Sequence, residues 1–341
     1  MAVTLPVQYQ EAADLIYKVA ALTSILDNGE IKMVGKEIKV KKISVDGAAN
    51  MTRGAAFTAG EFDALWETKT PNFDRGRKFT VDALDELEFG GLYMDLLAEY
   101  IRTKIAPELD AARFAAYAQA SGILTVTPAT LSDGAALLAA LNVAMGSMDT
   151  NEVPLEGRIL YAESSLLRAI QALDTTKSRE ILSSFVKVIG VPAGRFYTKI
   201  YQNDGTTTGQ TAGGFIRQGS QYSAWAAATA YVLNDMIEMS GKIYKCTTAG
   251  TSGAAAPTWP TSGTVADGAG ALVWTFQETS GREINFMIIH QSAPLQGVKR
   301  TVTPVLAPDA DYDAYRVSNR VYGIHEVYDN KVKGIYLHNK A

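Results

Sequence analysis

The side chains that most often carry out chemistry are few in this sequence and far apart. Its histidines are His290, His325 and His338, and Cys246 is the single cysteine. None of them stands at a spacing typical of zinc ligands, and one cysteine cannot form a disulfide within the chain. These residues predict no cofactor and no metal centre of that type. A lone thiol is also typical of a protein made in a reducing cytoplasm.

An acidic cluster offers the one arrangement suited to acid–base catalysis, because paired carboxylates can hydrolyse glycosides. The cluster contains Asp82, Asp85, Glu86 and Glu88. The same residues open a segment with helical periodicity, where acidic side chains interact favourably with the helix dipole. We favour this second interpretation, a charged first turn of a solvated helix.

Motifs for nucleotide or acyl-transfer chemistry are missing from the sequence. The Gly-rich stretch 204–214 lacks the Gly-Lys-Ser/Thr ending of a phosphate-binding loop, and the chain contains no Gly-x-Ser-x-Gly elbow. We therefore expect that the protein is not an enzyme.

Basic side chains gather on two predicted strands. Lys39, Lys41 and Lys42 lie on the first, and Arg75 and Arg77 lie on the second. Such a stripe could bind nucleic acid. The whole chain, however, has 32 Lys and Arg against 36 Asp and Glu and a formal net charge of −4. We therefore favour contacts with acidic groups of partner proteins.

Length and composition limit the kind of protein in which these residues are placed. A chain of 341 residues, 47% of them hydrophobic, predicts a globular protein of two or three domains, because one core rarely serves more than roughly 250–300 residues. No apolar run approaches the ~20 residues of a membrane span. The first residues lack the basic and apolar parts of a secretory signal, so we expect no secretion.

The first third of the chain changes from a helical to an extended pattern. Apolar residues at helical spacing predict a helix over 7–26. A period of two then predicts one long hairpin over 36–82, with a bulge at Lys42. On its returning strand we expect one face to carry Arg75, Arg77, Phe79 and Val81.

The following segments mix helices and strands. Leucines and isoleucines at steps of three to five predict a helix from 82 to about 121, which Pro107 must kink or split. A second helix is expected to begin at a cap near Ser132 or Asp133. The apolar run 284–289 is typical of a buried strand. Residues 219–281 hold few charged side chains, three of the four tryptophans and short β-like runs, which predicts a small inserted all-β domain.

The order of these elements resembles the major capsid proteins of tailed bacteriophages with the Hong Kong 97 (HK-97) fold. The resemblance covers roughly 1–218 and 282–338. Local sequence supports it in Asn-Phe-Asp-Arg-Gly-Arg-Lys-Phe at 72–79, Ala-Pro-Glu-Leu-Asp-Ala-Ala-Arg-Phe at 106–114, Phe-Tyr at 196–197, Gln-Thr-Ala-Gly-Gly at 210–214 and the strand at 284–290.

The resemblance implies an α+β fold with five parts. These are an N-terminal arm (1–35), an E-loop hairpin (36–82), a peripheral domain with a long spine helix (83–131 and 301–338), an axial domain (132–218 and 282–300) and the inserted all-β domain (219–281).

It also implies a structural function. Copies of the chain would assemble in the bacterial host cytoplasm into hexamers and pentamers of an icosahedral virion shell, with portal and scaffolding proteins as partners. The shell would enclose double-stranded DNA without sequence-specific binding and would contact no membrane. Intersubunit contacts are expected at Lys39, Lys41, Lys42, Arg75, Arg77, Glu86 and Glu88. The two arginines would pair with carboxylates of an adjacent spine helix or, alternatively, within their own subunit.

The insertion resembles small chitin- or cellulose-binding β modules, for example in Gly-Lys-Ile-Tyr-Lys-Cys at 241–246 and Pro-Thr-Trp-Pro at 257–260. Such modules stack exposed aromatic rings on sugars. Glycan-binding candidates are Trp259, Trp225 and Tyr231. We favour a core role for Trp225, Tyr244 and Trp274, and we expect Trp259, in a Pro-flanked loop, to be the most exposed. The module would project from the outer surface of the shell.

Two other functions stay open. A nanocompartment of the encapsulin type shares the fold but encloses protein cargo, so it would co-purify with an enzyme. A carbohydrate-binding protein could use the α/β part as a carrier, and it would be a monomer with affinity for sugar.

Overall fold

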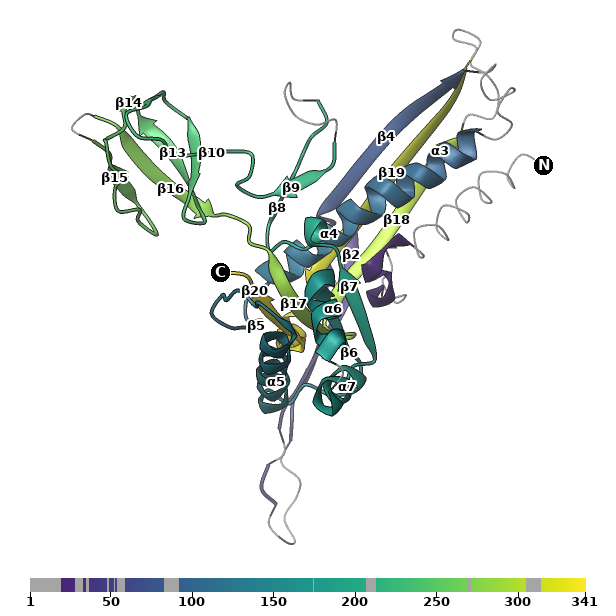
Figure 1. Cartoon of the computed structure of the whole chain (residues 1–341). Coiled ribbons are helices and arrows are strands. Elements are labelled where there is room, and N and C mark those ends of the chain that lie inside the picture. The colour runs from purple at the N-terminus through teal and green to yellow at the C-terminus, as the bar shows by residue number, and fades with distance from the viewer. Residues whose placement is uncertain are drawn as a thin grey trace. The chain divides into compact units, whose positions relative to one another are not determined.

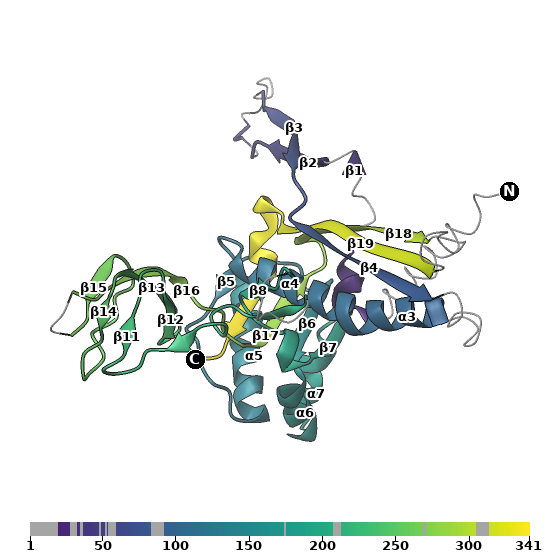
Figure 2. The ribbon, with the colours of Figure 1, turned by 90° about the horizontal axis from the view of Figure 1, so that it is seen from above.

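Contacts within the chain divide the computed structural model into two units. The first contains the described residues of 26–95 and 295–325, and the second contains those of 20–25, 96–294 and 326–341. Figure 1 and Figure 2 label their elements in two views. The structure describes residues 20–27, 33–34, 37–47, 49–51, 53, 59–82, 92–173, 175–206, 213–268, 271–304 and 314–341.

The first unit holds two three-stranded sheets, one in the order β1-β2-β3 and one in the order β18-β19-β4. The pairs β1/β2, β2/β3 and β4/β19 are antiparallel. The strands are β1 (Met33–Val34), β2 (Glu37–Val45), β3 (Phe62–Lys69), β4 (Phe73–Asp82), β18 (Pro294–Pro304) and β19 (Ala314–Val327).

The segment expected to form one hairpin contributes to both sheets. β2 pairs with β3 without interruption, from Ile38 opposite Lys69 to Val45 opposite Phe62. The bulge predicted at Lys42 is therefore wrong. Pro71 lies between β3 and β4, and a proline cannot donate to a strand ladder. β4 pairs with β19 instead of β2.

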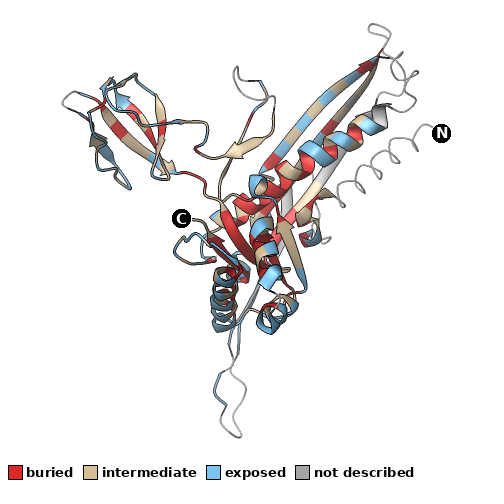
Figure 3. Cartoon of the chain, in the orientation of Figure 1, coloured by how far each residue is buried: buried red, intermediate tan, exposed pale blue. Residues whose placement is uncertain are grey.

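Asn72 helps to fix β4 against β19. Its Nδ2 donates to the carbonyl of His325 at 3.0 Å, and its Oδ1 accepts from the His325 N–H at 3.0 Å. The side-chain amide thus replaces the backbone pairing that Pro71 interrupts. Burial then alternates along β4, with Phe73 and Val81 buried (Figure 3), which confirms the predicted common face.

The predicted spine helix has three consecutive parts, namely α3 (Leu92–Tyr100), the π-helical turn η2 (Ile101–Ile105) and α4 (Ala106–Gln119). Backbone angles stay helical through Tyr100 and Ile105. Pro107 lacks an N–H and its ring would meet the carbonyl of Thr103, and the wider π turn accommodates both effects. The kink or split predicted at Pro107 is thus a π-helical turn just before the proline, within a continuous helix.

A mixed five-stranded sheet forms the centre of the second unit, in the order β5-β20-β17-β6-β7. Its strands are β5 (Leu124–Thr125), β6 (Arg158–Glu163), β7 (Lys187–Val191), β17 (Ile284–His290) and β20 (Ile335–Asn339). Both β17 and β6 are buried along most of their length (Figure 3), as the continuous apolar run predicts for β17.

Helices cover this sheet. Leu160, Phe286 and Ile288 pack with α5 (Gly134–Thr150), α6 (Ser164–Leu173) and α7 (Thr176–Ser183) in one core. Tyr161 contacts Phe114 of α4, with ring centroids 5.2 Å apart. Of the two predicted caps, Ser132 and Asp133, it is Asp133 that caps α5, by accepting from the N–H of Ala136 at 2.8 Å.

A buried carboxylate on α4 holds the N-terminal segment. Asp110 accepts from the N–H groups of Leu22 and Thr23, each at 3.0 Å, and from the Thr23 hydroxyl at 2.6 Å. Arg195 adds an ion pair at 3.2 Å. These bonds fix the short 3-10 helix η1 (Leu22–Leu26). Most of the helix predicted over 7–26 lies outside the described residues.

The remaining elements are two short helices, a hairpin and the insertion. The helices are η3 (Ala193–Arg195) and η4 (Asp329–Gly334), and the hairpin pairs β8 (Ile200–Gln202) with β9 (Phe215–Arg217). The insertion is all-β, as predicted, with the sheets β10-β12-β13-β16-β15 and β11-β14. Its strands are β10 (Ser223–Ala224), β11 (Ala230–Tyr231), β12 (Met236–Met239), β13 (Lys242–Thr248), β14 (Gly250–Thr251), β15 (Thr264–Ala266) and β16 (Val273–Thr279).

Candidate functional site

The residues predicted to contact neighbouring subunits are described unevenly. Lys39, Lys41 and Lys42 lie on β2, of which the structure describes the backbone. Glu86 and Glu88 lie outside the described residues. A contact role for these five positions stays a prediction.

Arg75 and Arg77 are half-buried on β4. In the register with β19, Arg77 stands opposite Asn319. Both arginines already interact within the chain. Whether they pair with carboxylates of a neighbouring subunit or of their own stays a prediction.

A hollow of about 620 Å³ lies along β4 and β19. Gly76 lines it, and a Cβ atom there would lie 3.1 Å from the carbonyl oxygen of Asn319, so the glycine allows the two strands to approach closely. Arg320 donates to Asp74 through Nε at 2.7 Å and also through Nη2. These hydrogen bonds hold the pKa of the Asp74 carboxyl below its ordinary value. The hollow is therefore lined by the Arg320–Asp74 ion pair and by the backbone of β4 at Gly76, which no side chain covers.

Asn319 is an unusual residue of this sheet. Its side chain is buried, and neither its oxygen nor its nitrogen has a hydrogen-bond partner in the described part of the chain. An unpaired buried amide costs about 1–3 kcal/mol. The position therefore marks a place where the described part of the chain leaves a polar contact unmade.

In the inserted module one carboxylate binds two tryptophans. Asp267 is fully buried, and its Oδ2 accepts from Nε1 of Trp225 at 2.7 Å and from Nε1 of Trp274 at 3.0 Å. Its Oδ1 accepts from the N–H of Gly253 at 2.9 Å. Sequence reasoning missed this residue. The available signal was an isolated acid in a segment rich in tryptophan and poor in charge.

The aromatic residues of the module form one cluster around Trp274. The rings of Tyr231 and Trp274 lie 4.8 Å apart edge to face, and Trp259 lies 4.6 Å from Tyr244 and 6.3 Å from Trp274. Tyr244 and Trp274 are buried, and Trp225 packs against them, which confirms the core role we favoured for these three residues.

The Trp259 ring is half-buried in this cluster, so its expected place as the most exposed of the glycan-binding candidates stays a prediction. The Tyr244 hydroxyl donates to the Pro260 carbonyl at 2.7 Å, which holds the loop on the core. Trp225 and Tyr231 are also half-buried. The three glycan-binding candidates are thus close together but offer partial faces, not a projecting platform.

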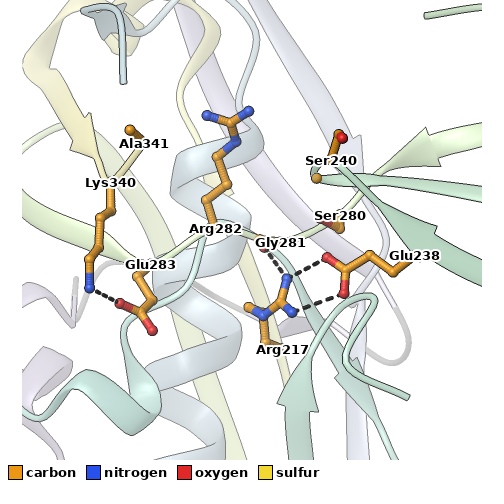
Figure 4. Close-up of a pocket in the computed structure, with 10 residues that line it drawn as sticks. Arg217, Glu238, Ser240, Ser280, Gly281, Arg282, Glu283, Lys340 and Ala341 are labelled. Carbon is orange, nitrogen blue, oxygen red and sulfur yellow. Dashed lines mark hydrogen bonds and ion pairs between the residues drawn. The ribbon is translucent and has the colours of Figure 1, made fainter. Parts of the chain in front are cut away.

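A polar cavity of about 540 Å³ lies where the module joins the rest of the second unit (Figure 4). Arg217 of β9 donates to both oxygens of Glu238 on β12, at 2.8 and 3.0 Å, and to the carbonyl of Gly281 at 2.8 Å. Lys340 pairs with Glu283 at 2.7 Å. The cavity thus contains two ion pairs, one of which connects the module to β9.

The charges of the Arg217–Glu238 pair stabilise each other. Burial alone would raise the pKa of Glu238, but the hydrogen bonds and the charge of Arg217 outweigh it and hold that pKa below its ordinary value. The same hydrogen bonds from Arg217 raise the pKa of its own guanidinium. Both groups therefore stay charged at neutral pH, and the contact between β9 and the module is an ion pair.

Two further features of the described residues bear on function. No group of three or more metal-ligating side chains occurs among them. None of the helices in the described ranges combines the length and apolarity that crossing a membrane requires.

Solved structures similar to the whole chain come from virus-like and phage particles. A virus-like particle from Pyrococcus furiosus matches with a TM-score of 0.50 and 10% identity, over 98% of this chain and 100% of that one. The capsid of Staphylococcus phage Andhra has a TM-score of 0.49 and 10% identity, over 94% and 84% of the two chains. The capsid of the cyanophage P-SCSP1u has a TM-score of 0.47 and 12% identity, over 94% and 88%.

Within the insertion, residues 224–275 match the model of carbohydrate-binding module family 5/12. A comparison with curated proteins gives no match. The fold expected from the sequence is confirmed. The chain has an α+β, HK-97-like capsid fold, into which a small all-β module similar to carbohydrate-binding module family 5/12 is inserted.

Proposed function

We propose that the chain is a structural subunit, the major capsid protein of a tailed bacteriophage, which assembles with copies of itself into an icosahedral shell around double-stranded DNA. The observation that supports this most is the likeness to a virus-like particle subunit over 98% of this chain and the whole of that one. The segments 72–79 and 106–114 resemble phage capsid sequences, which favours a phage capsid over a nanocompartment.

The sheet β1-β2-β3 adds a physical argument. Its strands pair only with one another among the described residues. A ribbon dominated by two strands is marginally stable in water on its own. At about 3.4 Å per residue, the paired length of β2 and β3 reaches about 27 Å. Contacts with a neighbouring subunit would add burial to this sheet, and the Asn319 amide of the other sheet, which has no partner among the described residues, suits the same role.

The expected partners follow from this proposal. Copies of the chain would form hexamers and pentamers through heterologous contacts that close into rings. Portal and scaffolding proteins would complete assembly in the host cytoplasm. The DNA would be held without sequence-specific contacts, which agrees with a formal net charge of −4.

Size-exclusion chromatography followed by electron microscopy tests the proposal. We expect the full chain, alone or expressed with its portal and scaffolding proteins, to give closed shells or hexameric capsomers. Nuclease-protected DNA inside the shells would identify a capsid, whereas a co-purifying enzyme would identify a nanocompartment. A compact monomer under all of these conditions would contradict both.

A second function is proposed for the inserted module, adhesion to surface glycans from the outer face of the shell. Its support is the match of residues 224–275 to a carbohydrate-binding module and the partly exposed rings of Trp225, Tyr231 and Trp259. Retention of assembled particles on polysaccharide resins measures it. We expect retention to disappear on deletion of 219–281 and to weaken in Tyr231→Ala. Equal retention of intact and deleted particles would contradict it.

A further inference from the structure

The cavity at the base of the module brings together three cationic side chains from separate segments. Arg217 comes from β9, Arg282 from the connection that leaves the module, and Lys340 from the C-terminal end of the described chain. Figure 4 shows that they line one space. A volume of about 540 Å³ is within the range of sites for small ligands.

These three cationic side chains differ in whether a hydrogen bond or an ion pair within the chain already occupies them. Arg217 is bound to both oxygens of Glu238, and Lys340 is bound to Glu283. The Arg282 guanidinium has no hydrogen bond or ion pair with any described residue, and Figure 4 draws none to it. An arginine presents a planar fork of donors that fits a carboxylate through two parallel hydrogen bonds. Arg282 is therefore the lining group equipped to take an anionic ligand.

The Arg282 guanidinium lies beside a tight turn of the module. Ser240 and Gly241 connect β12 to β13, and both have positive φ, at 52° and 71°. A Cβ atom on Gly241 would lie 3.6 Å from Nη2 of Arg282, so the guanidinium lies against this turn. The Ser240 hydroxyl is exposed and lines the same cavity. A ligand held by Arg282 would meet a hydroxyl and polar backbone from the module.

We propose that this cavity binds the carboxylate of an acidic sugar, with Arg282 as the residue that forks onto it. The sugar class follows from the surroundings, because the cavity is polar, contains a hydroxyl suited to sugar hydroxyls and adjoins a module similar to carbohydrate-binding modules. Recognition by charge also suits a module whose aromatic rings are at most half-exposed. The inference rests on the module's likeness and is independent of shell assembly.

Isothermal titration calorimetry on the full chain at low ionic strength tests this site. The probes are glucuronic acid and N-acetylneuraminic acid, with glucose and N-acetylglucosamine as neutral analogues. We expect saturable millimolar binding of at least one acid, with its neutral analogue at least about tenfold weaker. Arg282→Gln should weaken acid binding by about tenfold or more, and Arg282→Lys by less, because an ammonium retains the charge without the fork.

Arg168→Gln is the matched control. Arg168 is an exposed arginine of α6, outside the cavity and without an ion pair among the described residues, and its replacement should leave acid binding unchanged. Three results would overturn the proposal, namely no saturable binding of either acid, equal binding of neutral and acidic sugars, or equal affinity in Arg282→Gln and the intact chain. Electron microscopy of the same variants reports shell assembly separately, so failure of this site and failure of the capsid proposal are distinguishable.

Discussion

Asp267 shows how one residue organises the inserted module. Its carboxylate joins Trp225 near the start of the insertion, Gly253 in the middle and Trp274 on β16. Hydrogen bonds to a buried charged group contribute about 1.5–3 kcal/mol each, and their loss also leaves buried donors unpaired. Stability of a module this small therefore depends strongly on one acid.

We predict that Asp267→Asn lowers the free energy of unfolding of the module by about 3 kcal/mol, because an amide cannot accept from all three donors. Urea unfolding followed by tryptophan fluorescence measures this loss. Asp235→Asn is the control, since the Asp235 carboxylate accepts from the N–H of Val232 in an exposed turn and its loss should cost about 1 kcal/mol or less. Similar losses in the two variants would contradict the central role of Asp267.

His338 makes the second unit sensitive to pH. Nδ2 of Asn285 donates to the carbonyl of Ala129 at 2.7 Å and lies 3.0 Å from Nδ1 of His338. The first bond fixes the amide, so a donor faces the imidazole and favours its neutral form. The ring also stacks on Phe286, with centroids 5.0 Å apart. Burial lowers the pKa of His338 below its ordinary value of 6.5.

Stability should therefore fall in acid. The folded state keeps His338 neutral, while the unfolded chain takes up a proton near its ordinary pKa, so the contribution is complete above about pH 6.5 and is lost as pH falls through the folded pKa. Urea midpoints measured at neutral pH and at mildly acidic pH check this. We expect His338→Gln to show a smaller fall than the intact chain. Parallel falls in both proteins would assign the effect to other groups.

At the scale of elements, two glycines of α5 give opposite predictions. A Cβ atom on Gly134 would lie 2.4 Å from the carbonyl oxygen of Ala169, so α5 packs directly on the backbone of α6. Gly134→Ala should destabilise the protein by about 1–3 kcal/mol. Gly146 is exposed in the same helix with nothing within 4 Å of its Cβ position, and Gly146→Ala should stabilise by about 0.5–1 kcal/mol. Thermal unfolding of both variants measures these changes, and equal signs would contradict the packing.

Elements with strong local signals could be predicted from the sequence. The pair Ser132 and Asp133 predicted the start of α5 to within one residue, and the apolar run of β17 predicted a buried strand. The partner of β4 could not be predicted, because β19 lies far away in the chain and a single sequence does not specify such a register. The packing of the Trp259 loop on the core could not be predicted for a similar reason, since the hydrogen bond from Tyr244 to Pro260 depends on the folded loop and not on local composition.

At the scale of the whole molecule, the insertion is a part that should be removable without unfolding the rest of the second unit. The N–H of Gly281 donates to the carbonyl of Gln218 at 2.8 Å, so its two ends meet. Its ion pairs to the host, Arg217 with Glu238 and Lys199 with Glu278, are partly exposed. Pairs of this kind contribute about 0–1 kcal/mol each. The rest of the second unit should therefore depend little on the module.

We predict that a chain in which a Gly-Gly linker replaces residues 219–281 folds and assembles as the intact chain does. Electron microscopy should show particles of unchanged size that have lost density on the outer face. A second version with a longer Gly-Ser linker distinguishes a strained junction from a real requirement for the module. Failure of both versions to assemble, while the intact chain forms shells, would show that the module takes part in the intersubunit contacts. Loss of density from the inner face would place it toward the enclosed DNA.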